Sequence, residues 1–380
     1  MGETIFTFSY PENSGFGSSE IHFHSGSPDL GGLFSAESDH PRLFVSDTTI
    51  ASLPSMKDFI GSFVPEKNDS ENLDTRIRGN DILLILGPGE KFKTLESVTQ
   101  IDVAALAHNF NRNCEFVGIG GGVICDMTAF AASIYKRGVD VSFVPTTLLA
   151  MVDASVGGKS GCDIKGFKNM IGSFWPAKKL HVWSDFVLSL PENEFISGLG
   201  EALKTALLFS PEMWRTLAEN SESVLSRDSA LLQNIIEECV KAKALVVEED
   251  FRERGKRSFL NLGHTFGHAL ESVAGLGTIT HGEAVVWGIG RSLDLAANLS
   301  LCKKDYADGT KKVLAMYGYD MNASPKILSG FNGDTSRALI DAMKKDKKNL
   351  SSAIRVVMQK GLCDTVVQEV SDKEIEAVLR

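Results

Sequence analysis

The stretch Phe116-Val-Gly-Ile-Gly-Gly-Gly-Val-Ile-Cys-Asp126 decides the fold class of this chain. A short apolar run ends in three consecutive glycines and continues into a helix-forming segment, which predicts a buried strand, a tight turn and a helix. Backbone N–H groups at such a turn can approach a phosphate at the helix N-terminus. The stretch is not a GxGxxG fingerprint, because Val123 and Cys125 stand where the third glycine would be needed. A nucleotide site and a purely structural turn both fit this pattern.

Similar apolar runs occur through the first half of the chain, at residues 43–45, 82–86, 141–144 and 180–183. They alternate with helix-period segments such as 94–110, as in βαβ units with buried parallel strands. Residues 21–24 fit an edge strand in a region rich in glycine and serine. We therefore expect residues 1–190 to form an α/β domain with a Rossmann-like parallel sheet.

The pattern changes after Pro191. Apolar residues recur there at spacings of three and four, which predicts long helices. The segments concerned are 192–208, 210–226, 230–247, 262–274 and 284–298. Strand-like runs are scarce, so residues 191–380 are expected to form an all-α domain.

Charge and composition narrow the classes of partner. The 380 residues carry a formal net charge of −10, which disfavours nucleic acid and anionic membranes. An anionic ligand would therefore need a local basic cluster. The six cysteines form no CxxC pair, as expected in a reducing compartment. The first residues lack signal-peptide features, and no apolar run approaches the roughly 18 residues of a membrane helix, so we expect a cytoplasmic protein.

A group of histidines and a glutamate could hold a metal ion. Asn261, His264 and His268 follow one another at i, i+3 and i+7, on one face of an expected helix. His281 opens another helical segment, and Glu201 lies in an apolar helix where an unpaired carboxylate would be costly. Two histidines and a glutamate that leave positions open suit a catalytic Zn²⁺. Histidines satisfied without metal are the other interpretation.

A third segment could bind phosphate. In Val152-Asp-Ala-Ser-Val-Gly-Gly-Lys-Ser-Gly161, glycines surround Lys159, and Lys168-Asn169 follows. The P-loop pattern fails, because Val152 stands where its first glycine should be. A solvent-exposed lysine is the alternative here, as it is for the basic run at 344–348.

Taken together, these segments resemble the 3-dehydroquinate synthases, which are sugar phosphate cyclases. The likeness runs from about residue 43 to 366 and rests on six motifs in the family's order. They are Gly120-Gly-Gly-Val-Ile-Cys-Asp126, Pro145-Thr-Thr-Leu-Leu149, Val152-Asp-Ala-Ser-Val-Gly-Gly-Lys159, Lys168-Asn-Met-Ile-Gly172, Asn261-Leu-Gly-His-Thr-Phe-Gly-His268 and His281-Gly-Glu-Ala-Val285.

The resemblance implies an α/β NAD-binding domain followed by a helical metal-binding domain. It implies a carbon–oxygen lyase of the shikimate pathway, on the route to aromatic amino acids. Such an enzyme converts 3-deoxy-D-arabino-heptulosonate 7-phosphate, a small anionic sugar phosphate, into 3-dehydroquinate and phosphate. The steps are oxidation by bound NAD⁺, elimination of phosphate, re-reduction, ring opening and intramolecular aldol closure. A homodimer is also implied, because Arg137 matches an arginine that reaches a neighbouring subunit.

The same resemblance implies roles for individual residues. The metal, Zn²⁺ or Co²⁺, would be held by Glu201, His264 and His281. The NAD site would comprise Asp47, Gly89, Glu90, Lys93, Gly121, Gly122, Asp126, Thr146, Thr147, Lys159, Lys168, Phe186 and Ser189. Substrate would be bound by Arg137, Lys159, Asn169, Lys243, Arg257, Asn261, His268, Lys347 and Lys348. The residues implied in catalysis are Asp153, Lys204, Lys243, Arg257, Asn261 and His268.

Some positions depart from the family pattern without removing a ligand or a charged contact. They are Thr49, Cys125, Ile164, Lys165, Phe167, Ser189, Gly200 and Thr205. Two other enzymes remain as alternatives: another sugar phosphate cyclase of the valiolone or inosose type, and a metal-dependent polyol dehydrogenase. A non-catalytic relative would be expected to lack a metal ligand. Against another cyclase, the chain keeps the dehydroquinate synthase residues at Leu260, Asn261, His268 and Lys243.

Overall fold

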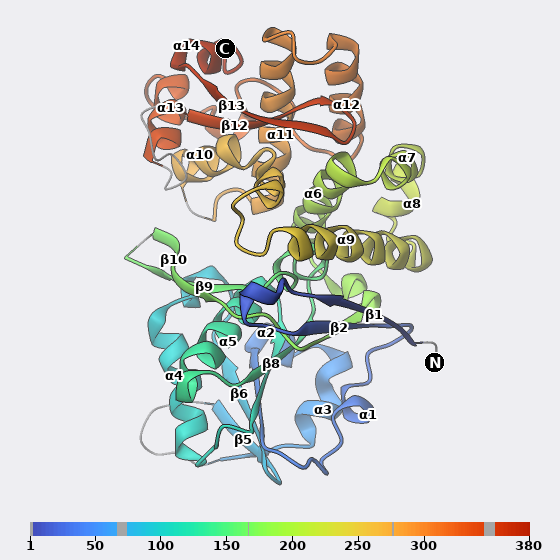
Figure 1. Cartoon of the computed structure of the whole chain (residues 1–380), viewed down its shortest axis with the longest axis vertical. Helices are drawn as coiled ribbons and strands as arrows, with labels where there is room; N and C mark the ends of the chain where they lie inside the picture. Colours follow the sequence, from blue (N-terminus) through green and yellow to red (C-terminus); the bar gives the residue numbers. More distant parts are fainter. Residues whose placement is uncertain (1–2, 67–73, 166, 276, 346–353) are drawn as a thin grey trace. The chain divides into compact units, whose positions relative to one another are not determined.

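The computed structural model describes residues 3–66, 74–165, 167–275, 277–345 and 354–380 (Figure 1). The chain forms two compact units. The first unit contains the residues up to Leu190 together with Lys243–Arg252, and the second contains Pro191–Ala242 and Glu253–Arg380. None of the helices in the described residues is long and apolar enough to cross a membrane. All six cysteines are free thiols, as the sequence predicts.

A large twisted sheet forms the centre of the first unit. Its strand order in the described residues is β1-β2-β11-β8-β7-β3-β6-β5-β4. The strands are β1 (Glu3–Ser9), β2 (Ser18–His24), β3 (Arg42–Asp47), β4 (Val64–Pro65), β5 (Asp74–Arg78), β6 (Asp81–Leu86), β7 (Glu115–Gly120), β8 (Asp140–Pro145) and β11 (Lys179–Trp183). The stretch from β2 through β11, β8, β7 and β3 to β6 is parallel. The predicted parallel α/β sheet is therefore confirmed.

One detail of the sheet differs from the prediction. Residues 21–24 were expected at an edge, but β2 pairs with β11 on one side and with β1 on the other. The edge strand is β1, because residues 3–9 fold back as an antiparallel partner of β2. The opposite edge is also antiparallel, formed by β5 and β4.

Helices and a separate hairpin complete the first unit. The helices are α1 (Leu30–Leu33), α2 (Thr48–Ala51), α3 (Lys57–Gly61), α4 (Leu95–Ala107) and α5 (Gly122–Ile134). Thr94 caps α4 by accepting a hydrogen bond from the Ser97 N–H, which satisfies a donor that the helix itself cannot pair. The hairpin consists of β9 (Lys159–Ile164) and β10 (Phe167–Phe174), which pair with each other outside the large sheet.

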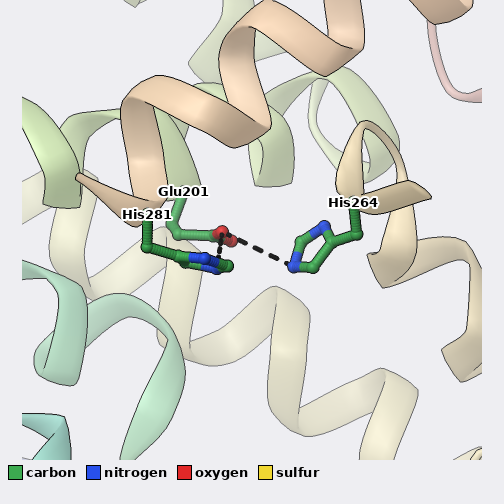
Figure 2. A group of neighbouring side chains, drawn as sticks. All are labelled: Glu201, His264 and His281. Carbon is green, nitrogen blue, oxygen red and sulfur yellow. Dashed lines mark ion pairs between the residues drawn. The ribbon is translucent and has the colours of Figure 1, made fainter. Parts of the chain in front are cut away.

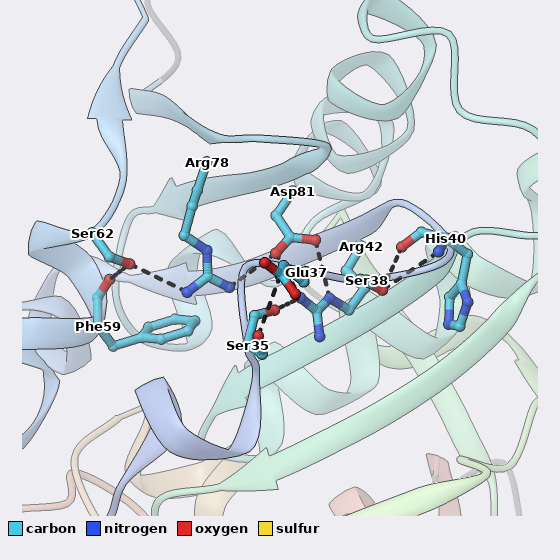
Figure 3. A network of polar contacts seen from close by, with 9 residues as sticks. All are labelled: Ser35, Glu37, Ser38, His40, Arg42, Phe59, Ser62, Arg78 and Asp81. Carbon is cyan, nitrogen blue, oxygen red and sulfur yellow. Dashed lines mark hydrogen bonds and ion pairs between the residues drawn. The ribbon is translucent and has the colours of Figure 1, made fainter.

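An ion-pair network links the amino ends of the neighbouring strands β3 and β6. Asp81, the buried first residue of β6, receives Arg42 Nε at 3.0 Å and Nη2 at 2.7 Å from the start of β3 (Figure 3). Arg78 Nη2 reaches the same carboxylate at 2.9 Å. A buried carboxylate remains charged at neutral pH at little cost only when it is paired in this way. Because these charges are bound to one another, we assign this end of the sheet a structural role.

The second unit is mainly helical, as predicted. Its helices are α6 (Glu192–Phe209), α7 (Pro211–Glu219), α8 (Ser221–Leu225), α9 (Ser229–Glu249), α10 (His264–Ala274), α11 (His281–Asn298), α12 (Lys304–Met316), α13 (Thr335–Lys345) and α14 (Asp372–Glu376). Helix α9 begins in this unit, and its residues from Lys243 onward belong to the first. The segment predicted as one helix over 210–226 divides at Asn220 into α7 and α8.

A hairpin is the main difference from a purely helical domain. Strands β12 (Ile354–Gly361) and β13 (Asp364–Val370) pair antiparallel. The residues of β12 that point inward, such as Ile354 and Met358, pack in one apolar core with Phe266 and Trp287. The hairpin thus supports the helices that carry the histidines.

Candidate active site

The predicted nucleotide-binding residues gather at the carboxyl ends of the parallel strands. Asp47 ends β3 and lies in register with Leu86, the last residue of β6. Gly120 ends β7 in register with Pro145 of β8, and the Thr146 N–H donates to the Gly120 carbonyl at 2.9 Å. Carboxyl ends of parallel strands are where such sheets bind ligands. The opposite, amino ends carry the Arg42 and Asp81 network described above.

The glycine turn between β7 and α5 is closely packed. A Cβ atom on Gly120 would lie 2.7 Å from Ile124 Cβ, and one on Gly121 would lie 3.0 Å from Thr147 Cγ2. The turn therefore has no room for side chains at these positions. A phosphate can still approach the backbone N–H groups that open the 13-residue helix α5. Cys125, which departs from the family pattern, is buried in α5.

Lys93 joins the glycine turn to the β9–β10 hairpin. Its Nζ lies 2.6 Å from Asp126 Oδ2 and 2.7 Å from Asn169 Oδ1. Burial alone would lower the pKa of the Lys93 ammonium, but the nearby carboxylates of Asp126 and Glu90 outweigh it and raise that pKa. Lys93 is therefore charged at neutral pH. The structure brings together residues implied for NAD and for substrate.

A second buried lysine pairs with a residue implied in catalysis. Lys243 Nζ lies 2.6 Å from Asp153 Oδ1, and it also donates to the Asp153 carbonyl. Asp153 lies in a π-helical turn, Ala150–Ala154, of a kind that occurs often at functional sites. Both residues belong to the first unit.

The three predicted metal ligands converge in the second unit. Glu201 comes from α6, His264 opens α10 and His281 opens α11 (Figure 2). Glu201 Oε1 lies 3.5 Å from His281 Nε2 and 3.9 Å from His264 Nε2. One donor atom from each residue falls within 4.8 Å of the other two. Lys204 forms a buried ion pair with the same glutamate.

Glycines let the three helices approach one another closely enough for this convergence. A Cβ on Gly282 would lie 1.9 Å from the Ser197 carbonyl oxygen, so α11 contacts the backbone of α6. The Gly282 N–H lies 3.1 Å from Ser197 Oγ, which adds a hydrogen bond at the same point. On α10, a Cβ on Gly267 would lie 2.9 Å from the Ala284 carbonyl oxygen of α11. Such contacts require residues without side chains.

The donor set fits a divalent cation. One buried carboxylate and two imidazoles are typical ligands of Zn²⁺ and Co²⁺, and three protein ligands leave positions for substrate. Burial would lower the pKa of His281, but Glu201 and Glu271 raise it to about 9. The two carboxylates therefore favour a positive charge at the His281 ring. Glu271 is not among the residues predicted from the sequence, although its place seven residues after His264 on α10 could have suggested it.

Three further predicted residues, His268, Arg257 and Asn261, also belong to the second unit. The His268 ring centroid is 5.3 Å from that of His264 and 6.0 Å from that of His281. Arg257 is buried in a 3-10 helix, Lys256–Asn261. The predicted common helix face for Asn261 and the histidines is wrong, because Asn261 ends that 3-10 helix and α10 begins at His264. Asn261 Nδ2 donates to the Ser258 carbonyl at 3.1 Å.

The remaining predicted residues have the following places. Gly89 and Glu90 open a short 3-10 turn after β6, and Phe186 and Ser189 lie in a 3-10 helix after β11. Lys159 opens β9, and Lys168 lies in β10. Arg137 is exposed, with a left-handed backbone at φ 70°. Lys347 and Lys348 lie outside the described residues.

Sequence comparisons identify related proteins over most of the chain. Residues 83–197 match the family described as 3-dehydroquinate synthase N-terminal, and residues 198–349 match 3-dehydroquinate synthase C-terminal. The 3-dehydroquinate synthase of Alkaliphilus metalliredigens (strain QYMF) is 38% identical over 73% of this chain and 76% of its own. That of Francisella tularensis subsp. mediasiatica (strain FSC147) is 34% identical over 89% of each chain.

Comparison with solved structures supports the fold. The chain superposes on 2-deoxy-scyllo-inosose synthase complexed with carbaglucose-6-phosphate, NAD⁺ and Co²⁺, with a TM-score of 0.80. The superposition covers 99% of both chains at 21% sequence identity. At this identity the likeness establishes a shared fold for the two proteins.

Proposed function

The chain belongs to the 3-dehydroquinate synthase family, and on that premise we propose that it converts 3-deoxy-D-arabino-heptulosonate 7-phosphate into 3-dehydroquinate and phosphate. The observation that carries the proposal is the cluster of Glu201, His264 and His281. Burying a carboxylate is costly, and the Glu201 carboxylate faces two imidazoles with which it can share a divalent cation.

The second unit would supply the cation site. A divalent cation held by Glu201, His264 and His281 would act as a Lewis acid on substrate hydroxyls. Lys204 holds the Glu201 carboxylate in place through its buried ion pair. His268 lies beside the cluster, and we assign it to the substrate phosphate. Arg257, which is buried in the same unit, is suited to bidentate recognition of a carboxylate.

The first unit would supply the nucleotide site. NAD bound at the carboxyl edge of the sheet would accept a hydride and return it. Asp47 ends a strand there, and its Oδ1 accepts hydrogen bonds from the Thr49 and Ile50 N–H groups, while Lys93 holds the Asp126 carboxylate. We assign Asp47 to the adenosine ribose and Asp126 to the same NAD site. Lys243, fixed by Asp153, is assigned to the substrate carboxylate, and Asn169 and Lys159 on the hairpin are assigned to the phosphate.

This set of residues favours the synthase over its two alternatives. A polyol dehydrogenase needs neither a phosphate site nor a carboxylate site, whereas this chain carries Lys159, Asn169, Lys243 and Arg257. A cyclase acting on sugar phosphates that lack a carboxylate needs no carboxylate site. The curated relatives, at 34–38% identity, are named 3-dehydroquinate synthase.

The proposal includes a homodimer. Arg137 is exposed, and it follows Lys136 in a pair of left-handed residues, a conformation that costs free energy. We assign Arg137 to the phosphate site of a second copy. We expect Arg137→Ala to lose affinity for phosphate, while its binding of metal and NAD stays intact.

One assay tests the function directly. Zinc-loaded protein with a catalytic amount of NAD⁺ is mixed with the heptulosonate phosphate, and phosphate and absorbance at 340 nm are followed together. We expect continuous phosphate release without accumulation of NADH. Stoichiometric NADH would indicate a dehydrogenase, and phosphate released only from sugar phosphates that lack a carboxylate would indicate another cyclase.

A further inference from the structure

Glu271 is a buried carboxylate beside the metal cluster to which neither the sequence nor the comparisons give a role. It lies on α10, two turns after His264, and only 7% of its surface is exposed. Its Oε2 is 3.5 Å from His281 Nδ1. The other nitrogen of the same ring, Nε2, is 3.5 Å from Glu201 Oε1. The His281 ring thus lies between two buried carboxylates.

The two histidines of the cluster are oriented in the same way. His264 Nδ1 lies 3.2 Å from the Leu262 carbonyl oxygen, and its Nε2 faces Glu201. A carbonyl can only accept a hydrogen bond, so in the neutral ring Nδ1 of His264 carries the proton, and Nε2 can offer its lone pair to a cation. His281 repeats this arrangement with Glu271 in place of the carbonyl. Histidines that bind metals commonly donate their second ring N–H to a carbonyl or a carboxylate.

We propose that Glu271 is a positioning residue that accepts the His281 Nδ1–H and so directs the Nε2 lone pair into the cation site. A carboxylate acceptor also increases the donor strength of the ring, which strengthens its bond to a cation. The inference rests on the proposed function, because it needs the cation site formed by Glu201, His264 and His281.

A competing assignment makes Glu271 a ligand itself. His268, Glu271 and His281 also bring one donor atom each within 4.8 Å of one another. In that arrangement His281 would bind through Nδ1, and Glu201 would be left out. The fully buried Glu201, which both Nε2 atoms face, argues for the first arrangement.

Cobalt binding tests the proposal without relying on turnover. The metal-free wild type and Glu271→Gln are titrated with Co²⁺ against a chromophoric chelator, and the visible bands of the bound ion are recorded. We expect the wild type to bind one Co²⁺. We expect Glu271→Gln to bind it 10- to 100-fold more weakly with shifted bands, the usual effect of losing such an acceptor. Glu271→Asp, which keeps the charge but moves it away, should fall between them.

A matched control removes the same charge from an exposed position of the same unit. Glu238 on α9 has a side chain that is 54% exposed, so Glu238→Gln should bind Co²⁺ like the wild type. Unchanged affinity in Glu271→Gln would overturn the inference. Loss of an oxygen ligand in the X-ray absorption spectrum of that variant would also overturn it, by making Glu271 a ligand. Failure of the wild type to bind Co²⁺ would instead refute the cation site of the proposed function.

Discussion

Replacing Gly282 with alanine tests how the metal ligands are brought together. Gly282 follows His281 directly, and Ser197 lies one helical turn before Glu201 on α6. The added Cβ would lie 1.9 Å from the Ser197 carbonyl oxygen, whereas ordinary van der Waals contact begins at 3.4 Å. Because the obstacle is backbone, it cannot rotate away. The two helices must therefore separate by about 1.5 Å, which is an overpacking strain.

The size of the effect follows from that displacement. Overpacking of this kind costs about 1–3 kcal/mol of folding free energy. Metal–ligand distances tolerate only about 0.2 Å, and the separation acts directly between His281 and Glu201. We therefore expect the Zn²⁺ affinity of Gly282→Ala to fall at least tenfold, equivalent to about 1.4 kcal/mol.

Urea unfolding of the metal-free protein and a Zn²⁺ titration measure both effects. Gly309→Ala is the control: Gly309 lies in α12, and a Cβ there meets nothing within 4 Å. That variant should gain about 0.5–1 kcal/mol, because alanine is the better helix former, and its Zn²⁺ affinity should not change. If Gly282→Ala binds Zn²⁺ as tightly as the wild type, the contact between α6 and α11 does not position the ligands.

Three further predictions concern single side chains. His264→Ala should abolish stoichiometric zinc, measured by elemental analysis after dialysis, and phosphate release; retained zinc would contradict the ligand assignment. Lys93→Met should weaken NAD⁺ binding in calorimetry by at least tenfold, because Asp126 loses its buried partner; unchanged affinity would remove Lys93 from the site. Burial raises the pKa of Asp102 to about 7, so the folded protein keeps a proton that the unfolded chain releases above about pH 4. Asp102 therefore contributes stability that is lost as pH rises from about 4 to 7, and raising the pH from 5 to 8 should lower the urea unfolding free energy of the wild type relative to that of Asp102→Asn; an equal change in both proteins would refute the cause.

The sequence pattern predicts the buried sheet because its strands are uninterrupted apolar runs. Ile82 to Leu86 and Phe116 to Ile119 could hardly be exposed, and the glycines after Gly120 fix where the following helix begins. The outermost strands of the sheet are harder to predict than its buried strands. Residues 3–9 and 18–24 carry similar mixtures of polar and apolar side chains, and only their pairing decides that β1, not β2, is outermost.

The candidate site depends on contacts that residue spacing does not encode. Glu201 and His281 are far apart in the chain, and they meet because glycines remove side chains where α6, α10 and α11 cross. The resemblance to a known family predicts the metal ligands, but it does not explain why they converge. The sequence does not predict the role of Glu271, because a glutamate in a helix is common and only the packing of a neighbouring helix places an imidazole against it.

Anomalous diffraction at the zinc edge, on crystals of the zinc-loaded protein, would locate the bound cation and identify its ligands. We expect one peak, bounded by the Glu201 carboxylate and the Nε2 atoms of His264 and His281. A peak bounded instead by His268, Glu271 and Nδ1 of His281 would contradict it.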